Sequence, residues 1–348
     1  MASLTITALY SKKILFGFSV LLGSLLLLLI VFIFGKNIIQ MVFPPEPDPA
    51  LVAFGKLPEL TMPESVIPPK NVTYKIETIS GDLKELKTKL KVFAIDISSA
   101  PRFGDLNSAN GKAQKAKFAL PPLNVSDNTA TYADMLNKSK TLSIDLITGD
   151  ILLKSDYLNN TDLITSQVKE EAEIKKSAIV FLTAFGLDPA VYPKEKMTTT
   201  RYKIDGGKLT EVASGTPANL IQVNLNRDDL DTIPVVRSVF KSPKITVLAS
   251  AGGIVSAKAQ IVKIQEYRFS TYPLKGIKKA YADLTAGKAI YNKELEGDMF
   301  PIRDVSLAYL DTDSAQSFLQ PVYVFSADDG LAAYVSAVSE DWIKIKSN

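Results

Sequence analysis

The longest run of apolar positions in the chain lies close to its N-terminus. From Ile14 to Phe34 the sequence has 21 consecutive positions without a charged side chain. An α-helix rises about 1.5 Å per residue, so this run spans roughly 30 Å, the hydrocarbon thickness of a bilayer. A cleaved signal peptide has a shorter apolar core that ends in a small-residue cleavage site, and no such site follows here. The pattern therefore predicts an uncleaved membrane anchor, with Ile14 and Phe34 at its ends.

The charges beside this run predict its orientation. Lys12 and Lys13 precede it, whereas Lys36 alone follows it. Positive charge tends to stay on the cytoplasmic side. We expect residues 1–13 to form a cytoplasmic head and residues 14–35 a transmembrane helix. The chain would then be a single-pass protein of the cell membrane, with its C-terminal domains extracytoplasmic.

Proline dominates the segment that follows. Residues 44–69 contain eight prolines in 26 positions. Proline fixes the backbone φ angle and favours extended polyproline geometry. Residues 36–70 are therefore predicted to be a semi-rigid spacer that holds the folded region away from the lipid.

Apolar and polar positions then alternate with the period of two that β-strands require. The predicted strands are residues 72–76, 92–97, 142–146 and 151–153, with a hairpin turn at 148–150. The polar stretch 101–117 is predicted to be a loop or a short helix. We expect residues 71–160 to form a β-rich domain.

Two later segments carry the helical period. In residues 166–186 the apolar side chains, among them Ile174 and Leu182, fall on one face, and residues 274–284 repeat this pattern. Each segment is followed by alternating strands. The predicted strands are residues 220–225, 245–248 and 255–261 after the first helix, and 305–309, 322–325 and 333–338 after the second.

This order of helix, strand and hairpin occurs twice, about 105 residues apart. It predicts two α+β modules, residues 161–272 and 273–348. The fold class expected for the whole chain is α+β: an N-terminal transmembrane helix followed by repeated modules, each a curved antiparallel sheet packed on a helix.

The amino-acid composition excludes several kinds of catalytic and metal site. The chain has no Cys and no His. Zinc sites depend on these residues, and the common acyl-transfer triads need His as the proton carrier. Disulfides and thiol redox chemistry are excluded as well. Beyond Lys36 the chain holds 37 basic and 37 acidic side chains. A nucleic-acid-binding protein normally has a basic surplus, so no nucleic-acid partner is expected.

Several short motifs resemble catalytic or metal sites. Ser166 and Lys169 match S-x-x-K, as do Ser238 and Lys241, and residues 126–128 read S-D-N. Their order is reversed relative to penicillin-binding enzymes, and no K-T-G follows. We interpret Ser166 as a residue near the N-cap of the predicted helix.

Two groups of aspartates occupy predicted turns. They are Asp228, Asp229 and Asp231 in one group and Asp311 and Asp313 in the other. Neither has the central Gly and terminal Glu of a calcium-binding EF-hand loop. No catalytic, cofactor-binding or metal-ligating residue is therefore predicted, and no cofactor.

Some strand phrases resemble a known family. Residues 233–236, 244–247 and 252–255, and residues 304–309 and 320–325, are similar to PepSY-type modules and to the extracytoplasmic domains of YycH/YycI-type regulators of a two-component histidine kinase. The resemblance covers residues 166–348. It implies repeated α+β modules behind a single anchor, and regulation through protein contacts rather than catalysis. Where such families often carry Trp after the proline of the last phrase, this chain has Tyr323.

These features together predict a membrane-anchored, non-enzymatic binding or regulatory protein of the cell envelope. Its partners would be membrane lipid, through the N-terminal helix, and another envelope protein. A homo-oligomer is compatible with the same features. Two alternatives stay open: a carboxylate-based hydrolase of envelope polymers, which needs two carboxylates in one cleft, and a structural subunit of an envelope assembly, which needs an exposed apolar patch.

Overall fold

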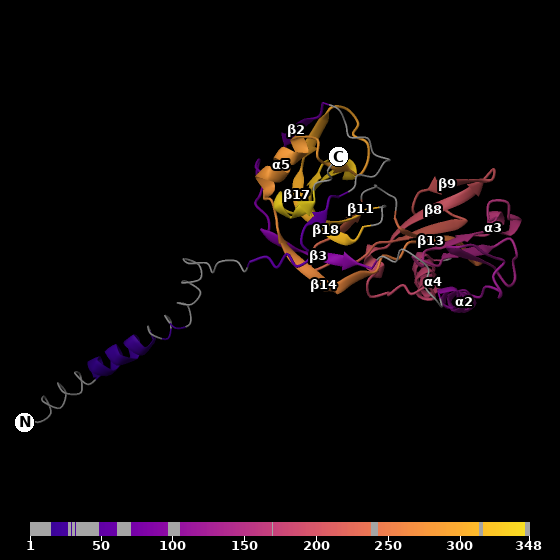
Figure 1. Cartoon of the computed structure of the whole chain (residues 1–348), viewed down its shortest axis with the longest axis horizontal. Coiled ribbons are helices and arrows are strands. Elements are labelled where there is room, and N and C mark those ends of the chain that lie inside the picture. Colours follow the sequence, from indigo (N-terminus) through magenta and orange to yellow (C-terminus); the bar gives the residue numbers. More distant parts are fainter. Residues whose placement is uncertain are drawn as a thin grey trace, which may run out of the picture. The chain divides into compact units, whose positions relative to one another are not determined.

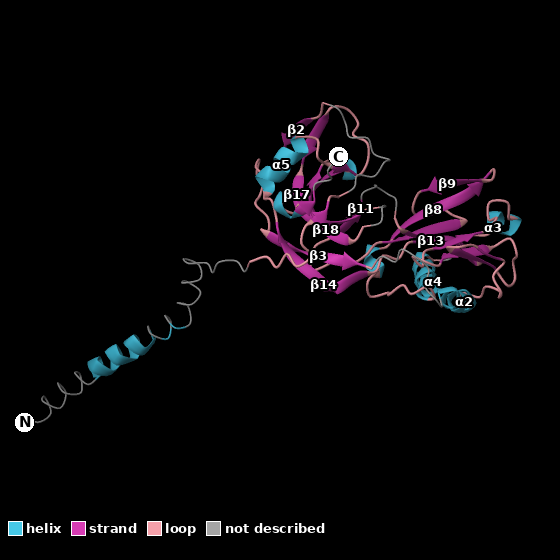
Figure 2. Ribbon diagram, in the orientation of Figure 1, coloured by secondary structure: helices cyan, strands magenta, loops and turns pink. Residues whose placement is uncertain are grey.

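The computed structural model describes residues 15–26, 29, 32, 49–60, 71–96, 105–168, 170–237, 243–312 and 316–344. The chain separates into two units, residues 1–49 and residues 50–348. The larger unit is a mixed α+β structure, as predicted (Figures 1 and 2).

In the first unit, residues 15–26 are helical and their side chains are exposed. Among the residues that the structure describes, no helix combines the length and the apolar character needed to cross a bilayer. Ile14 and Phe34, the predicted ends of the anchor, lie outside the described residues.

The second unit is built on two sheets. In its described part, nine strands form one sheet in the order β4-β5-β6-β7-β13-β12-β10-β8-β9, and all of these pairings are antiparallel. The strands are β4 (Asn124–Val125), β5 (Thr129–Ala133), β6 (Thr141–Asp145), β7 (Ile151–Lys154), β8 (Thr198–Asp205), β9 (Lys208–Val212), β10 (Leu220–Leu225), β12 (Ile245–Ser250) and β13 (Gly253–Ala259).

Helices α2 (Asp105–Lys115) and α4 (Glu171–Thr183) share the core on one face of this sheet (Figure 2). Ile174, Ala178 and Leu182 of α4 recur at helical spacing and are buried, so one stripe of the helix faces the strands. The short helix α3 (Thr161–Thr165) packs by β8, in a separate apolar cluster.

The second sheet has, among the described residues, seven strands. Five follow the order β11-β17-β18-β19-β15, and β3 pairs with both β14 and β18. All pairings are antiparallel except β11 with β17. The strands are β3 (Lys89–Ile95), β11 (Val235–Arg237), β14 (Ile264–Pro273), β15 (Ile290–Tyr291), β17 (Asp304–Asp311), β18 (Phe318–Ser326) and β19 (Ala332–Ser336).

Helix α5 (Ile277–Thr285) packs on this second sheet, next to β19. Its buried residues Ile277, Ala280 and Leu284 join Tyr309, Tyr323 and other strand side chains in one core. Each of the two sheets therefore holds a helix against one face.

Two parallel pairs of short strands complete the unit. β2 (Thr73–Ile76) pairs with β16 (Met299–Ile302), and β1 (Leu57–Pro58) pairs with β20 (Ile343–Lys344). The predicted spacer, residues 36–70, contains β1 but not β20, and in residues 50–60 the structure differs from the expectation of a spacer held away from the fold. Residues 50–60, which we call the strap, lie against the fold because Leu57 is fully buried and the N–H groups of Leu51, Val52 and Ala53 donate hydrogen bonds to β14.

The strands lie close to their predicted positions, but the sheets cross the predicted domain boundaries. β7, from the predicted domain 71–160, pairs with β13 of the first predicted module. β14, at the end of that module, pairs with β3. The stretch 101–117, predicted as loop or short helix, contains α2, in which Ala109 and Ala113 are buried. The predicted division into domains stays a prediction.

Candidate functional site

The second sheet has an open edge beside β19. β15 is the outermost strand there and pairs with Ala333 and Tyr334. In the described part of the chain this pairing does not continue to Ser336, the last residue of β19. A groove of about 550 Å³ lies at this edge and is lined by Ile290, Tyr334 and Ser336. We call it the edge groove. Its volume is within the range of about 300–1,000 Å³ that is usual for ligand sites.

The register directs main-chain groups of Ser336 toward the edge groove. The N–H of Ala337 donates to the carbonyl of Pro321 on β18, at 3.0 Å. Consecutive residues of an antiparallel strand turn their N–H and C=O groups to opposite sides. Those of Ser336 therefore point away from β18, to the side that β15 leaves uncovered. The hydroxyl of Ser336 is buried and has no hydrogen-bond partner among the described residues.

The walls of the edge groove come from segments far apart in the sequence. One wall is formed by Lys275, Asp283, Gly287 and Lys288, from α5 and its flanks. The other is formed by Glu59 and Leu60 of the strap with Glu340 and Ile343 near the C-terminus. The groove thus combines an open strand edge with apolar side chains and charged groups of both signs.

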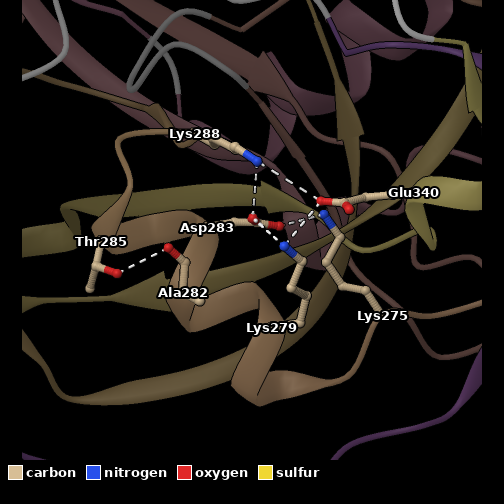
Figure 3. Close-up of polar contacts among 7 residues, drawn as sticks. All are labelled: Lys275, Lys279, Ala282, Asp283, Thr285, Lys288 and Glu340. Atoms are coloured by element: carbon tan, nitrogen blue, oxygen red, sulfur yellow. Dashed lines mark hydrogen bonds and ion pairs between the residues drawn. The ribbon is translucent and has the colours of Figure 1, made fainter.

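Three lysines surround one buried carboxylate in the first wall (Figure 3). The Asp283 side chain is 3% exposed, and the Nζ of Lys275 lies 2.8 Å from its Oδ2. The Nζ atoms of Lys279 and Lys288 each lie 3.4 Å from its Oδ1. These two lysines also contact Oε1 of Glu340, at 3.3 and 3.9 Å. We call these five residues the lysine cluster.

The position of Asp283 explains why it needs several cations. It lies in the last turn of α5, where the helix dipole disfavours a negative charge. Burial alone would raise the pKa of Asp283. The hydrogen bond and charge of Lys275, with the charges of Lys288 and Lys279, instead hold its pKa below the usual range. Asp283 is therefore ionised at neutral pH and does not serve as a general acid.

Two hydroxyl groups lie at the edge groove. That of Ser336 has no hydrogen-bond partner among the described residues. Burial raises the pKa of Tyr334 to about 12, so its hydroxyl stays protonated. The chemistry of the groove suits binding: backbone and hydroxyl groups for hydrogen bonds, and ammonium groups for carboxylates.

One carboxyl group elsewhere has a raised pKa. Burial, with a smaller effect from the Asp145 charge, raises the pKa of Asp150. Both residues belong to the hairpin between β6 and β7, where Asp145 accepts hydrogen bonds from the N–H groups of Ile147 and Thr148. Neither lines the edge groove. The pair therefore gives a stabilised turn rather than the cleft that a hydrolase requires.

The structure does not bring the sequence motifs together into a site. Ser166 caps the C-terminus of α3, and its hydroxyl donates to the carbonyl of Leu163. Its predicted place near an N-cap is wrong, because α4 begins later, after Glu170. Ser126 lies in the turn between β4 and β5, where its hydroxyl bonds to Thr129. Lys169, Ser238 and Lys241 lie outside the described residues.

The aspartate groups form ion pairs. Asp228 and Asp229 both contact Lys196, Asp231 contacts Lys91, and Asp311 contacts Lys244. Asp313 lies outside the described residues. No group of three or more potential metal-ligating side chains occurs in the part of the chain that the structure describes.

Sequence reasoning did not identify the edge groove. The spacing of Lys279 and Asp283, one helical turn apart, is a readable signal for an ion pair. Lys275 and Lys288 flank the helix in loops, so only the folded chain shows that they converge. The exposed edge at Ser336 depends on the short length of β15, which no residue pattern indicates.

Comparisons with known proteins give distant structural neighbours. No family model and no curated protein sequence matches the chain. YycH from Bacillus subtilis is similar with a TM-score of 0.33 and 13% identity, over 74% of this chain and 54% of YycH. The YpeB C-terminal domain from Bacillus megaterium is similar with a TM-score of 0.31 and 10% identity, over 67% of this chain and 92% of that domain.

This chain thus spans about half of the YycH structure that it matches. The neighbours include YycH, the type of protein that the strand phrases of the sequence resemble. Both similarities are low.

Proposed function

We propose that this chain is a membrane-anchored, extracytoplasmic binding protein, which acts without catalysis and receives an extended polypeptide segment of an envelope protein in the edge groove. The main observation that supports this proposal is the uncovered strand edge at Ser336. A peptide that adds to a sheet edge gains main-chain hydrogen bonds, and neighbouring pockets select its side chains.

The groove offers both kinds of contact. The N–H and C=O of Ser336 supply the next pair of main-chain hydrogen bonds beyond β15. Leu60 and Ile343 provide apolar contacts, and Lys279 and Lys288 have side chains that are 48% and 62% exposed. We infer that the segment is extended and carries a carboxylate, which the two exposed lysines would contact.

Anchoring rests on the sequence. The uncharged run from Ile14 to Phe34, with Lys12 and Lys13 before it, supports a single-pass helix with the N-terminus cytoplasmic. The groove would then face an extracytoplasmic space, with the strap connecting it to the anchor. Insertion is tested by glycosylation or cysteine-labelling reporters fused at the C-terminus. Protection of that C-terminal reporter in intact cells would contradict the orientation.

Strand addition is tested on the full anchored chain in cells. A photo-crosslinking amino acid at position 288, on the groove wall, should capture a polypeptide, and the same probe at Ser80, an exposed serine outside the groove, should not. Ser336→Pro removes the N–H that faces the groove, whereas Ser336→Ala keeps it. Because this N–H does not bond to β18, proline is expected to be tolerated at this edge position.

We expect Ser336→Pro to abolish capture at position 288 and Ser336→Ala to keep most of it. A urea midpoint close to that of the unmodified chain would show that both variants fold. Equal capture by the two variants would exclude strand addition. Equal capture at positions 288 and 80 would exclude the groove as the site.

A second function, as a subunit of an assembly, is favoured by one observation. Five large apolar side chains near the β4 edge are exposed: Leu120 (44%), Leu123 (64%), Val125 (46%), Met135 (58%) and Leu136 (98%). Patches of this kind often mark protein interfaces. A photo-crosslinker at position 123 distinguishes the two functions, because an assembly of identical subunits predicts covalent dimers of this chain.

A further inference from the structure

A second groove lies where the C-terminal end of α2 meets the outer side of α4, two helices on one face of the nine-stranded sheet (Figure 2). It has a volume of about 530 Å³ and is lined on the α2 side by residues 115–117. On the α4 side it is lined by residues 173, 176, 177, 180, 181 and 184, which recur at intervals of three or four and therefore share one side of the helix. We call it the helix groove.

Positive charge exceeds negative charge in the lining of the helix groove. Its three lysines, Lys115, Lys117 and Lys176, are exposed and form no ion pair with any other described residue. Glu173 is, in the described part of the chain, the one carboxylate that lines the groove. The side chain of Val180 is 65% exposed there. The lysines are solvated as they stand, so they are available to an anionic partner, and the groove offers that partner an apolar contact as well.

Exposed apolar side chains continue this side of the sheet beyond α2. Val125 of β4 pairs with Ala130, which is buried in the core that α2 and α4 share. Directly paired residues point to the same side of a sheet, so Val125 lies on the side that carries the helices, and Leu123, two residues earlier, does so as well. Leu120 follows shortly after the α2 wall of the groove and is also exposed. We call the helix groove together with Leu120, Leu123 and Val125 the helix face.

The segment that would tether this unit to a membrane is short. Because the strap, residues 50–60, is part of the fold, the chain between the predicted transmembrane helix and the folded unit is reduced to residues 36–49. At about 3.5 Å per residue this segment spans at most about 50 Å. A folded unit of about 300 residues has a radius of gyration of roughly 19 Å. A bilayer that holds the anchor would therefore stay within reach of the unit at a high effective concentration, and a few weak contacts would suffice for docking.

We infer that the helix face docks on the surface of a bilayer that contains anionic phospholipids, an inference that rests on the anchoring in the proposed function. Headgroup phosphates contact the three lysines of the helix groove, and Leu123 and Val125 enter the boundary between headgroups and acyl chains. The charge favours lipid over a second copy of this chain. In a two-fold symmetric contact the second copy would bring the same positive groove to the interface, whereas an anionic lipid surface neutralises it.

The test places a polarity-sensitive fluorophore on the full chain, which has no Cys, so that one introduced cysteine is labelled selectively. Val180→Cys carries the label in the helix groove. The chain is incorporated into nanodiscs of phosphatidylcholine alone or of phosphatidylcholine mixed with phosphatidylglycerol. The emission at position 180 should shift to shorter wavelength in the anionic discs only, and added salt should reverse the shift because it screens the lysines. The same label at Ser80, an exposed residue outside the helix face, should not respond.

Charge variants then locate the contact. Replacing all three lysines of the helix groove by Gln should remove most of the shift, because each lysine near an anionic surface adds to the attraction. A control variant makes the same change in net charge at exposed lysines outside the helix face and should keep the shift: Lys203→Gln, Lys208→Gln and Lys278→Gln. The replaced lysines are exposed in both variants, so both are expected to fold.

The outcomes separate docking from anchoring. A chain that enters the anionic discs without a shift at position 180 would overturn the docking and leave the anchoring intact. A chain that enters neither kind of disc would contradict the anchoring, and the docking with it. An equal shift in both kinds of disc, or an equal loss in both charge variants, would contradict a contact through the groove lysines. A photo-crosslinker at position 123 should give lipid adducts in the anionic discs, and covalent dimers in their place would favour an assembly of subunits and contradict lipid docking.

Discussion

Both sheets of the second unit bury one face against a helix, but the two helices differ in what they bury. On the nine-stranded sheet, α4 presents Ile174, Ala178 and Leu182, all buried, to strands with apolar side chains. On the seven-stranded sheet, α5 buries Ile277, Ala280 and Leu284 in the same way, but it also buries Asp283. The buried face of α4 is therefore apolar, whereas the buried face of α5 includes an ionised carboxylate at the edge of its sheet.

The buried charge of α5 lies beside the open edge of the seven-stranded sheet. Two of the lysines that neutralise Asp283, Lys275 and Lys288, line the edge groove, where β15 leaves part of β19 uncovered. A buried ion pair contributes little net stability compared with apolar side chains of the same size. The presence of one at this edge is consistent with a role in binding, because the same ammonium groups can contact a ligand. Three predictions test how far the two helices are alike.

The largest effect is expected where the helices are equivalent. Leu182 of α4 and Leu284 of α5 are both fully buried in the cores of their sheets. Replacing either by Ala removes apolar contacts and leaves a cavity, so each variant should lose about 3 kcal/mol of unfolding free energy. Urea denaturation of the full chain, with an unchanged slope, is the measurement. A much smaller loss for Leu284→Ala would show that charge, rather than packing, holds α5 in place.

The sequence predicted the apolar face of α4 and the positions of many strands. The 3.6-residue period placed Ile174 and Leu182 on one face, and alternation located β10 and β17 nearly to the residue. The pairing of β14 with β3 was not readable, because a strand pattern does not identify a partner about 170 residues away. The strap was missed because its proline content resembles a linker, whereas it packs through a few scattered apolar residues, Val52, Phe54 and Leu57, and forms only a two-residue strand.

The second prediction concerns the one charge that α5 buries. Lys275 is the most buried lysine of the cluster, at 9% exposure, and has the shortest contact with Asp283. Lys275→Met keeps the apolar stem but leaves Asp283 with two solvent-facing lysines. Breaking a buried pair typically costs 3–5 kcal/mol, and the two remaining lysines should reduce this to about 2 kcal/mol.

The matched control is Lys176→Met on α4, where the lysine is exposed, and its effect should stay within about 0.5 kcal/mol. Chemical denaturation at neutral pH compares the two variants. If both lost the same amount, Lys275 would be no more important than a surface lysine. The lysine cluster would then have no stabilising role.

The smallest effects are expected from two aspartates, one near each sheet, whose pKa values shift in opposite directions. The pKa of Asp283 is lowered in the folded chain, so its ionised form stabilises the fold above the unfolded pKa, near 4. This contribution is lost as the pH falls through the folded value. Asp283→Asn should therefore be less stable than the unmodified chain by roughly 1–2 kcal/mol at pH 7, and the difference should close below about pH 4.

Asp150, in the hairpin of the nine-stranded sheet, should behave in the opposite way. Its folded pKa is raised by burial, so the neutral form is favoured, and the stability it contributes at low pH is lost as the pH rises through the folded value. Asp150→Asn mimics the neutral form and should be more stable than the unmodified chain at pH 7, by less than about 1 kcal/mol, with no gain near pH 3. Thermal unfolding of both variants between pH 3 and pH 7 measures the two trends together. Parallel trends would mean that the two carboxylates share one kind of environment, and the contrast between the two sheets would then lie in their apolar packing alone.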